Sequence, residues 1–131
     1  MAFPVVDGLR TMEIGSVGEM RERLNGLILA GEKRATAGLV QENEDEPFEH
    51  LGERLVLVDD LGRRVGIVEV TDTTLTTFGR VPWSFAQAEN EGDESIEEWR
   101  DGHRRFWRSE GIDVTDETPV FLVCFKLIEA R

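Results

Sequence analysis

The chain has 131 residues, of which 40% are hydrophobic, and its formal net charge is −12 at pH 7. This length predicts one domain over residues 1–131 with a single core, and the excess of carboxylates argues against binding of duplex DNA, which requires lysine and arginine to neutralise phosphates. Cys124 is the one cysteine, so an intramolecular disulfide and a zinc site built from cysteines are excluded. Because the sequence shows neither a signal peptide nor an apolar run of about 20 residues, we expect a cytoplasmic protein without a membrane segment.

The first predicted helix follows residues 1–15, which show no clear period and are predicted to form an irregular lead-in. Ser16 and Glu19 have the spacing of a helix capping box. The apolar residues that follow fall on one helical face: Met20, Leu24, Leu27 and Ile28. Gly31 can take the positive φ that ends a helix, whereas Gly26 within the helix costs about 1 kcal/mol relative to alanine.

The rest of the chain contains mostly strand patterns. Segments rich in apolar or β-branched residues are predicted as strands: Arg34–Val40, Arg54–Asp59, Arg63–Thr71, Thr73–Phe78 as an edge, and Pro119–Ile128. Gln41–His50 is a polar loop, and Asp60-Leu61-Gly62 indicates a hairpin turn. Ser95–Ser109 is helical, with its aromatic residues on one face. Because strict β-α-β alternation is missing, we predict an α+β fold, a small and mostly antiparallel β-barrel with two or three flanking helices.

The turn between the first helix and the first of these strands carries the best candidates for chemistry. Lys33 stands in the turn and Thr36 just inside the strand, and the turn must supply a rotation because strand positions three apart face opposite sides. The small residues Ala35, Ala37 and Gly38 leave space for a ligand beside Thr36. A partly buried lysine can act as a base toward a hydroxyl. Taken on spacing alone, a surface lysine and an ordinary strand threonine are the more frequent explanation.

A family resemblance changes this balance. Residues 27–39 resemble the signature of the ASCH domain family, in which a helix is followed by Gly-x-Lys-x-x-Thr and a strand of small residues; here these are Gly31, Lys33 and Thr36. Ala88–Asp93 is similar to the family's Ala-Glu-Gly-Glu-Gly-Asp stretch. The residues after it follow in the family's order, namely Ser95, Trp99, His103 and Phe106, and Pro119–Phe125 resembles the family's last strand. The similarity spans about residues 16–128.

The resemblance implies a PUA-like β-barrel that binds a small nucleoside or single-stranded RNA. Some small bacterial members are amidohydrolases that remove the acetyl group of N4-acetylcytidine, and their proposed catalytic lysine, threonine and glutamate correspond to Lys33, Thr36 and Glu89. We further expect a set of residues to contact the substrate: Gly31, Arg34, Gly38, Trp99 and His103. Gly38, where some subfamilies have arginine, and Asn90, where glycine is usual, are departures that leave the substrate open.

Three functions remain open at this point. In an amidohydrolase, Thr36 would attack the carbonyl, Lys33 would take its proton, and Glu89 would hold Lys33 or protonate the leaving amine. The alternatives are an RNA-binding module, indicated by the basic and aromatic helix around Arg104–Arg108, and a ribonuclease that uses the same pocket.

Two of these residues have a more ordinary explanation when they are considered without the resemblance. Glu89 lies in an acidic stretch, which is usually a solvated surface. For His103 a half-buried structural role is the more frequent explanation. No metal-ligand spacing and no cofactor signature is present, so neither a metal nor a cofactor is predicted.

Overall fold

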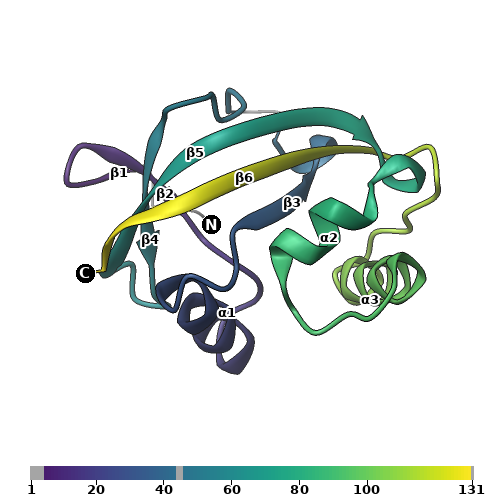
Figure 1. Ribbon diagram of the computed structural model, residues 1–131, viewed down its shortest axis with the longest axis horizontal. Helices are drawn as coiled ribbons and strands as arrows, with labels where there is room; N and C mark the ends of the chain where they lie inside the picture. The colour runs from purple at the N-terminus through teal and green to yellow at the C-terminus, as the bar shows by residue number, and fades with distance from the viewer. Residues whose placement is uncertain (1–4, 44–45, 131) are drawn as a thin grey trace.

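The computed structural model describes residues 5–43 and 46–130 (Figure 1). Its strands are β1 (Val5–Val6), β2 (Leu9–Met12), β3 (Ala35–Leu39), β4 (Arg54–Val58), β5 (Arg64–Thr77) and β6 (Pro119–Ala130). The helices are α1 (Glu19–Leu29), α2 (Trp83–Glu89) and α3 (Ile96–Ser109), with short 3₁₀ turns η1 (Val40–Asn43) and η2 (Phe78–Arg80). In this part of the chain, no helix combines the length and the apolar character needed to span a lipid bilayer.

The strands form one six-stranded mixed sheet in the order β1-β2-β4-β5-β6-β3. The β2–β4 pair is parallel and the other neighbours are antiparallel. The long β5–β6 ladder has register shifts at Ile67/Val68 and between Val70 and Asp72, and such bulges increase twist and bend a strand. The sheet therefore arches over the helices (Figure 1). The predicted α+β class with flanking helices is confirmed, but the sheet of the predicted β-barrel is not closed, because no ladder among the described residues joins β3 to β1 or β2.

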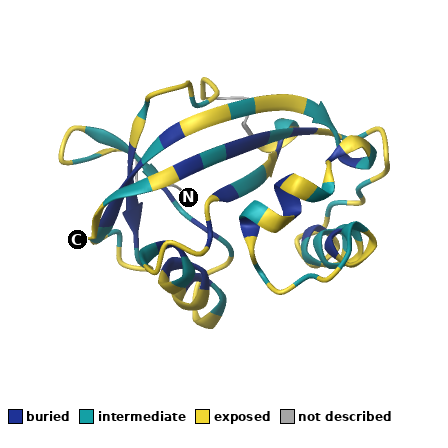
Figure 2. Ribbon diagram, viewed as in Figure 1, coloured by how far each residue is buried: buried dark blue, intermediate teal, exposed yellow. Residues whose placement is uncertain are grey.

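The strand β6 contributes to two hydrophobic clusters because its alternate residues face opposite sides of the sheet. Val123 and Phe125 belong to a cluster with Leu24 and Ile28 of α1, which we call the α1 cluster. The α3 cluster includes the β6 residues Val120 and Leu122, together with Phe85 of α2 and Trp99 and Trp107 of α3. Figure 2 shows the corresponding buried residues along the middle of β6, whereas much of the second half of β5 is exposed.

Several sequence predictions are confirmed in this fold. The β4–β5 hairpin, α3 and β6 lie where the pattern placed them, and Ser95 caps α3 by accepting a hydrogen bond from the amide of Glu98. Gly31 has a φ of 76° after α1. The threonine-rich segment is the second half of β5, which pairs with β6 alone among the described residues and so forms a local edge.

Other predictions are wrong for identifiable reasons. The predicted irregular lead-in contains the strands β1 and β2; residues 1–4 of the lead-in lie outside the described part. The sequence did not reveal β2 because its partner in the parallel pair, β4, is distant in the chain and leaves no local signal. The capping box at Ser16 does not form, since the N-cap of α1 is Gly18, whose amide donates to Asp60 of the β4–β5 turn at 3.0 Å. Helix α2, seven residues long, was not predicted at all.

Candidate functional site

Lys33 is almost completely buried at the turn between α1 and β3, with 1% of its surface exposed. Its Nζ donates hydrogen bonds to the Ala35 carbonyl at 2.7 Å and to Oε2 of Glu91 at 2.5 Å. A second carboxylate oxygen, Oε2 of Glu89, lies 3.9 Å away. Because the Ala35 carbonyl belongs to the peptide bond that precedes Thr36, the lysine side chain folds back onto the start of β3.

Glu89, at the end of α2, is 2% exposed. Its Oε1 accepts a hydrogen bond from the indole Nε1 of Trp99 at 2.5 Å and lies 3.2 Å from Nε2 of His103. Burial raises the pKa of Glu89, but the charge of Lys33 and the hydrogen bonds from His103 and Trp99 together outweigh it, and the pKa is lowered. The ordinary explanation of Glu89 as part of a solvated acidic surface does not hold. The residue is a buried, ionised carboxylate with two hydrogen-bond donors, Trp99 and His103, and the ammonium of Lys33 nearby.

His103 completes this group from α3. Its ring stacks on Trp99 with the centroids 4.0 Å apart, and its Nδ1 lies 2.9 Å from the Trp99 carbonyl oxygen. Burial lowers the pKa of His103, but the hydrogen bond and the charge of Glu89 raise it by more, so the pKa lies above its usual value. Each ring nitrogen faces an oxygen acceptor, and the doubly protonated ring satisfies both.

These side chains border a cavity of about 180 Å³, which we call the site pocket. Thr36, Glu89, Glu91 and His103 all line it. It continues into a wider depression of about 410 Å³, the outer groove, which shares Thr36 and Trp107 with the site pocket. The outer groove is lined by the acidic residues Glu13, Glu42, Glu46, Glu49 and Glu110, and no lysine or arginine of the described chain lines either hollow.

The site pocket lies beside β3, which forms one edge of the open sheet. On one side is β3 with Thr36, and on the other is the segment Ile14–Gly15 that follows β2. Gly15 has a φ of 64°, and a Cβ atom there would lie 3.0 Å from Cδ1 of Leu24. The positive φ favours glycine at this position, and any other residue would also press on the side chains of Leu24 and Met20 in α1.

The structure brings together some of the predicted site residues and separates others. Thr36, Glu89 and His103 line the site pocket, Lys33 lies behind it against Glu91, and Gly38 lines the outer groove. Trp99 is 0% exposed and lies beneath His103. The exposed residues Gly31 and Arg34 line neither hollow.

Sequence reasoning missed Glu91, the closest charged partner of Lys33. A signal was present, because Glu91 belongs to the same Ala88–Asp93 stretch as Glu89. Asn90 between them has a left-handed backbone with φ 51°, and its Nδ2 donates to the Glu32 carbonyl at 3.1 Å. This turn directs two nearby carboxylates toward Lys33. The pocket walls Ile14, Gly15 and Trp107 were also missed, because only the tertiary fold brings them here.

The sequence model of the ASCH domain family matches residues 10–129, and the chain belongs to this family. Among similar solved structures, an ASCH domain from Lactobacillus crispatus JV V101 has 26% sequence identity and a TM-score of 0.78, over 91% of this chain and 79% of that chain. A protein from Enterococcus faecalis V583, of the family named DUF984, has 22% identity and a TM-score of 0.84, over 96% and 80%.

A more distant ASCH protein, from Zymomonas mobilis, shares the fold with 9% identity and a TM-score of 0.55, over 84% of this chain and 68% of that chain. A search of curated protein sequences gives no significant match. The ASCH resemblance read from the sequence is thus confirmed at the level of family and fold.

Proposed function

We propose that the site pocket binds an acylated nucleoside and hydrolyses its amide bond, with N4-acetylcytidine as the type of substrate. One observation carries the proposal: the Thr36 hydroxyl, the carboxylates of Glu89 and Glu91, and His103 all line one pocket. The buried Lys33 lies directly behind them. The matching of this lysine and threonine to the family motif supplies the substrate class. The outer groove offers room for the sugar beside an inner cavity that takes the base.

The proposed reaction uses Thr36 as the nucleophile. Lys33 first passes a proton to Glu91, which lies 2.5 Å from its Nζ, and the neutral amine then takes the proton of the Thr36 hydroxyl. The Thr36 oxygen bonds to the acyl carbon, the carbon–nitrogen bond breaks, and the leaving amine receives the proton back from Lys33. Water then hydrolyses the acyl-threonine: its OH adds to the acyl carbon, and its other proton, taken up by Lys33 and passed on, restores the Thr36 hydroxyl. The carboxylic acid leaves, and Glu91 returns its proton to Lys33.

The lowered pKa of Glu89 bears on which of its two expected roles it plays. Glu89 is ionised, and its Oε1 faces Trp99 Nε1 and His103 Nε2. An ionised carboxylate has no proton to give to a leaving amine. We therefore assign Glu89 to orienting Lys33 and His103 rather than to protonating the substrate.

The charge around the pocket favours a small uncharged substrate over RNA. The outer groove is lined by glutamates, so a phosphodiester chain that entered it would meet charges of its own sign. The basic helix that motivated RNA binding is largely neutralised by its own neighbours: Arg104 pairs with Asp101 and Asp116, and Arg108 lies 3.7 Å from Asp113. The binding-module and ribonuclease alternatives therefore have less support.

Hydrolysis of N4-acetylcytidine, followed by chromatography, tests the proposal. We expect the wild type to release cytidine, Thr36→Ala to lose at least about 100-fold in kcat, and Thr36→Ser to retain part of the activity because it keeps the hydroxyl. Thr74→Ala, on the exposed part of β5, is the matched control and should leave the rate unchanged. If the wild type is inactive but binds single-stranded RNA in a salt-dependent manner, the RNA-binding alternative replaces this proposal.

A further inference from the structure

Four ionisable side chains at the site pocket form one continuous series of contacts. Nζ of Lys33 donates to Oε2 of Glu91 and lies 3.9 Å from Oε2 of Glu89. The other oxygen of Glu89, Oε1, lies 3.2 Å from Nε2 of His103 and accepts a hydrogen bond from Trp99. We call Lys33, Glu89, Glu91 and His103 the charge cluster. When the lysine and the histidine are both protonated, its two positive and two negative charges balance.

Glu89 lies between the two cations of the charge cluster. It is 2% exposed, and each of its oxygens faces a different cation, Oε2 toward Lys33 and Oε1 toward His103. A carboxylate at this depth needs a cation close by, because removing an unpaired charge from water is costly. Among the described residues, Lys33 and His103 are the two cations within 4 Å of Glu89.

The reaction proposed for the site pocket removes one of these two cations. When Lys33 passes its proton to Glu91, both side chains become neutral, and Lys33 no longer balances the charge of Glu89. Without a second cation, this proton transfer would leave a buried carboxylate uncompensated, and the transfer would be opposed. His103 remains 3.2 Å from Oε1 of Glu89 and supplies that second cation.

The surroundings of His103 hold its ring in the charged form. Its Nδ1 lies 2.9 Å from the Trp99 carbonyl oxygen, which can only accept, so Nδ1 must carry a proton. A neutral ring with its proton on Nδ1 would direct a lone pair at Oε1 of Glu89, whereas the doubly protonated ring donates to both oxygens. The ring is fixed between two indoles, stacked on Trp99 at 4.0 Å and edge-on to Trp107 at 5.4 Å.

The charged groups that act on the ring from the neighbouring segments are carboxylates. They are Glu89 at the end of α2, and Glu91 and Asp93 in the turn that follows. All three favour the protonated imidazole. The stacking tryptophans of α3 add no charge, so the fixed cation at this position depends on the acidic segment after α2.

We propose that His103 is a positioning residue for the hydrolysis: it keeps Glu89 paired and ionised while Lys33 is neutral, and so allows Lys33 to act as the base toward Thr36. This inference rests on the function proposed above. His103 acts through Glu89 and exchanges no proton with the substrate. It also decides which carboxylate receives the lysine proton, because Glu89 stays paired with the histidine and Glu91 is left as the acceptor.

His103→Gln tests the inference in the N4-acetylcytidine assay, because glutamine keeps an N–H donor but removes the charge. We expect kcat to fall by about 10-fold or more, with a smaller change in KM. Between about pH 6 and pH 9, the wild-type rate should fall as the pH rises through the pKa of His103, and the variant should not show this fall. His50→Gln makes the same substitution at an exposed histidine and should leave the rate unchanged.

A double variant distinguishes charge balance from a merely structural role. If His103 serves to balance Glu89, then removing both charges restores the balance. Glu89→Gln/His103→Gln should therefore be about 5-fold or more faster than His103→Gln alone. A purely structural histidine predicts that the two losses add. The inference is overturned if the double variant is slower than His103→Gln, or if the wild type and His103→Gln have the same pH profile.

A measurement without substrate separates this inference from the proposed reaction. Lys33→Met/Glu91→Gln imitates the neutral pair that follows the proton transfer, in which Glu89 is left with His103 alone. Adding His103→Gln to this background should lower the urea midpoint further than the same substitution lowers it in the wild type. Should the background fail to fold, NMR titration of the His103 ring decides instead, with a lower midpoint expected in Glu89→Gln than in the wild type.

The two proposals can fail separately. A wild type that does not hydrolyse N4-acetylcytidine but shows the larger drop in urea midpoint contradicts the proposed reaction and supports His103 as the counter-ion of Glu89. Equal drops in the two backgrounds, or an unchanged titration of His103 in Glu89→Gln, contradict the inference whether or not hydrolysis occurs.

Discussion

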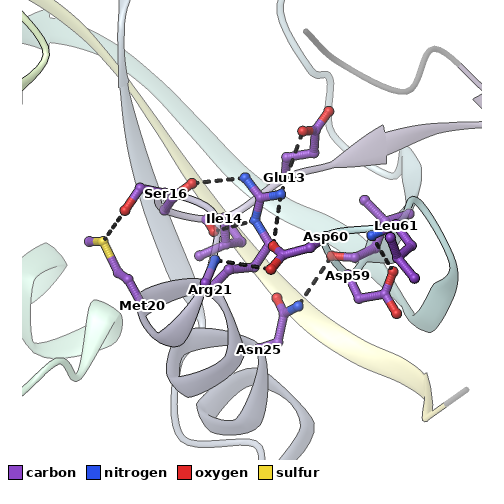
Figure 3. A network of polar contacts seen from close by, with 12 residues as sticks. Glu13, Ile14, Ser16, Met20, Arg21, Asn25, Asp59, Asp60 and Leu61 are labelled. Carbon is purple, nitrogen blue, oxygen red and sulfur yellow. Dashed lines mark hydrogen bonds and ion pairs between the residues drawn. The ribbon is translucent and has the colours of Figure 1, made fainter.

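Among the described residues, two cationic side chains are buried, and their surroundings differ. Lys33 is 1% exposed and has two carboxylates within 4 Å, one of them the fully buried Glu89. Arg21 is 7% exposed and also has two carboxylates within 4 Å, but these belong to Glu13 and Asp60, which are 19% and 38% exposed. Its closest partners are the backbone carbonyls of Ile14 and Gly15 (Figure 3). The comparison teaches that burial of a charge does not by itself mark a reaction site. Arg21 joins α1 to the segment Ile14–Gly15, and its carboxylates reach solvent. Lys33 instead contacts the buried Glu89, which His103 also contacts, behind the site pocket.

Replacing Lys33 should give the largest effect. Lys33→Met would leave Glu91 without its cation and Glu89 with His103 alone, and breaking a buried pair in this way costs about 3–5 kcal/mol of unfolding free energy. Urea denaturation measures it, with Lys126→Met as the control because Lys126 is exposed and contacts Glu69 at the surface. The pairing account also requires that Glu91→Gln restore part of the stability lost in Lys33→Met. A double variant as unstable as the single one would count against it.

Replacing Arg21 should have a smaller effect on stability and a different effect on the reaction. Arg21→Met removes the donors to two backbone carbonyls, and charged hydrogen bonds of this kind contribute about 1.5–3 kcal/mol. Because the arginine fixes one wall of the site pocket, we expect KM for N4-acetylcytidine to rise more than kcat falls. Arg23→Met, on the exposed side of α1, is the matched control. A loss in kcat with unchanged KM would indicate that Arg21 takes part in the reaction itself. Arg21 would then no longer differ from Lys33 in being a purely structural cation.

The region around Lys33 contains groups with shifted pKa values, so its contribution to stability should depend on pH. The pKa of His103 is raised above 6.5, so its contribution is fully present below that pH and is lost as the pH rises through its folded-state pKa. The pKa of Glu89 is lowered from 4.5, so its effect on stability has the opposite pH dependence: the contribution is present above pH 4.5 and is lost as the pH falls through the folded-state pKa. Urea unfolding between about pH 6 and pH 9 should therefore show wild type losing stability relative to His103→Gln. Parallel curves for the two proteins would refute the assignment.

The smallest effect on stability is expected at Thr36. Thr36→Val keeps the shape of the side chain and removes only the hydroxyl, and such a change at a half-buried position is expected to alter unfolding free energy by less than about 1 kcal/mol. The same variant should lose turnover of N4-acetylcytidine. Thermal unfolding beside the activity assay distinguishes a chemical role from a structural one, because a large drop in stability would show that the hydroxyl is needed for folding.

The sequence predicted the elements whose signal is local. The final strand, the β4–β5 hairpin and the Ser95-capped helix each carry their pattern within a short segment. The family motif that contains Lys33 and Thr36 likewise lies within one short segment. Local patterns failed wherever the determining partner is distant, as for β2, which pairs with β4, and for the start of α1, where Asp60 takes the Gly18 amide.

The burial of Glu89 shows the same limit within the site. From the sequence, the segment around Glu89 is expected to be a solvated surface, because several of its neighbours in the chain are acidic. In the fold, Trp99, His103 and Lys33 supply the donors that make burial of a carboxylate tolerable. None of these partners is adjacent to Glu89 in the chain, so neither composition nor periodicity could reveal the arrangement. Only the family motif marked the residue.

The placement of β3 at the end of the sheet has a consequence for biosynthesis. Within the described ranges its one strand neighbour is β6, with Ala35 opposite Cys124 and Leu39 opposite Val120. Thr36 therefore has no fixed strand partner until residues 120–124 have left the ribosome, and closing so long a loop makes this pairing intrinsically slow. A nascent chain can form the β4–β5 hairpin early, but it cannot carry a working pocket before its last strand has emerged.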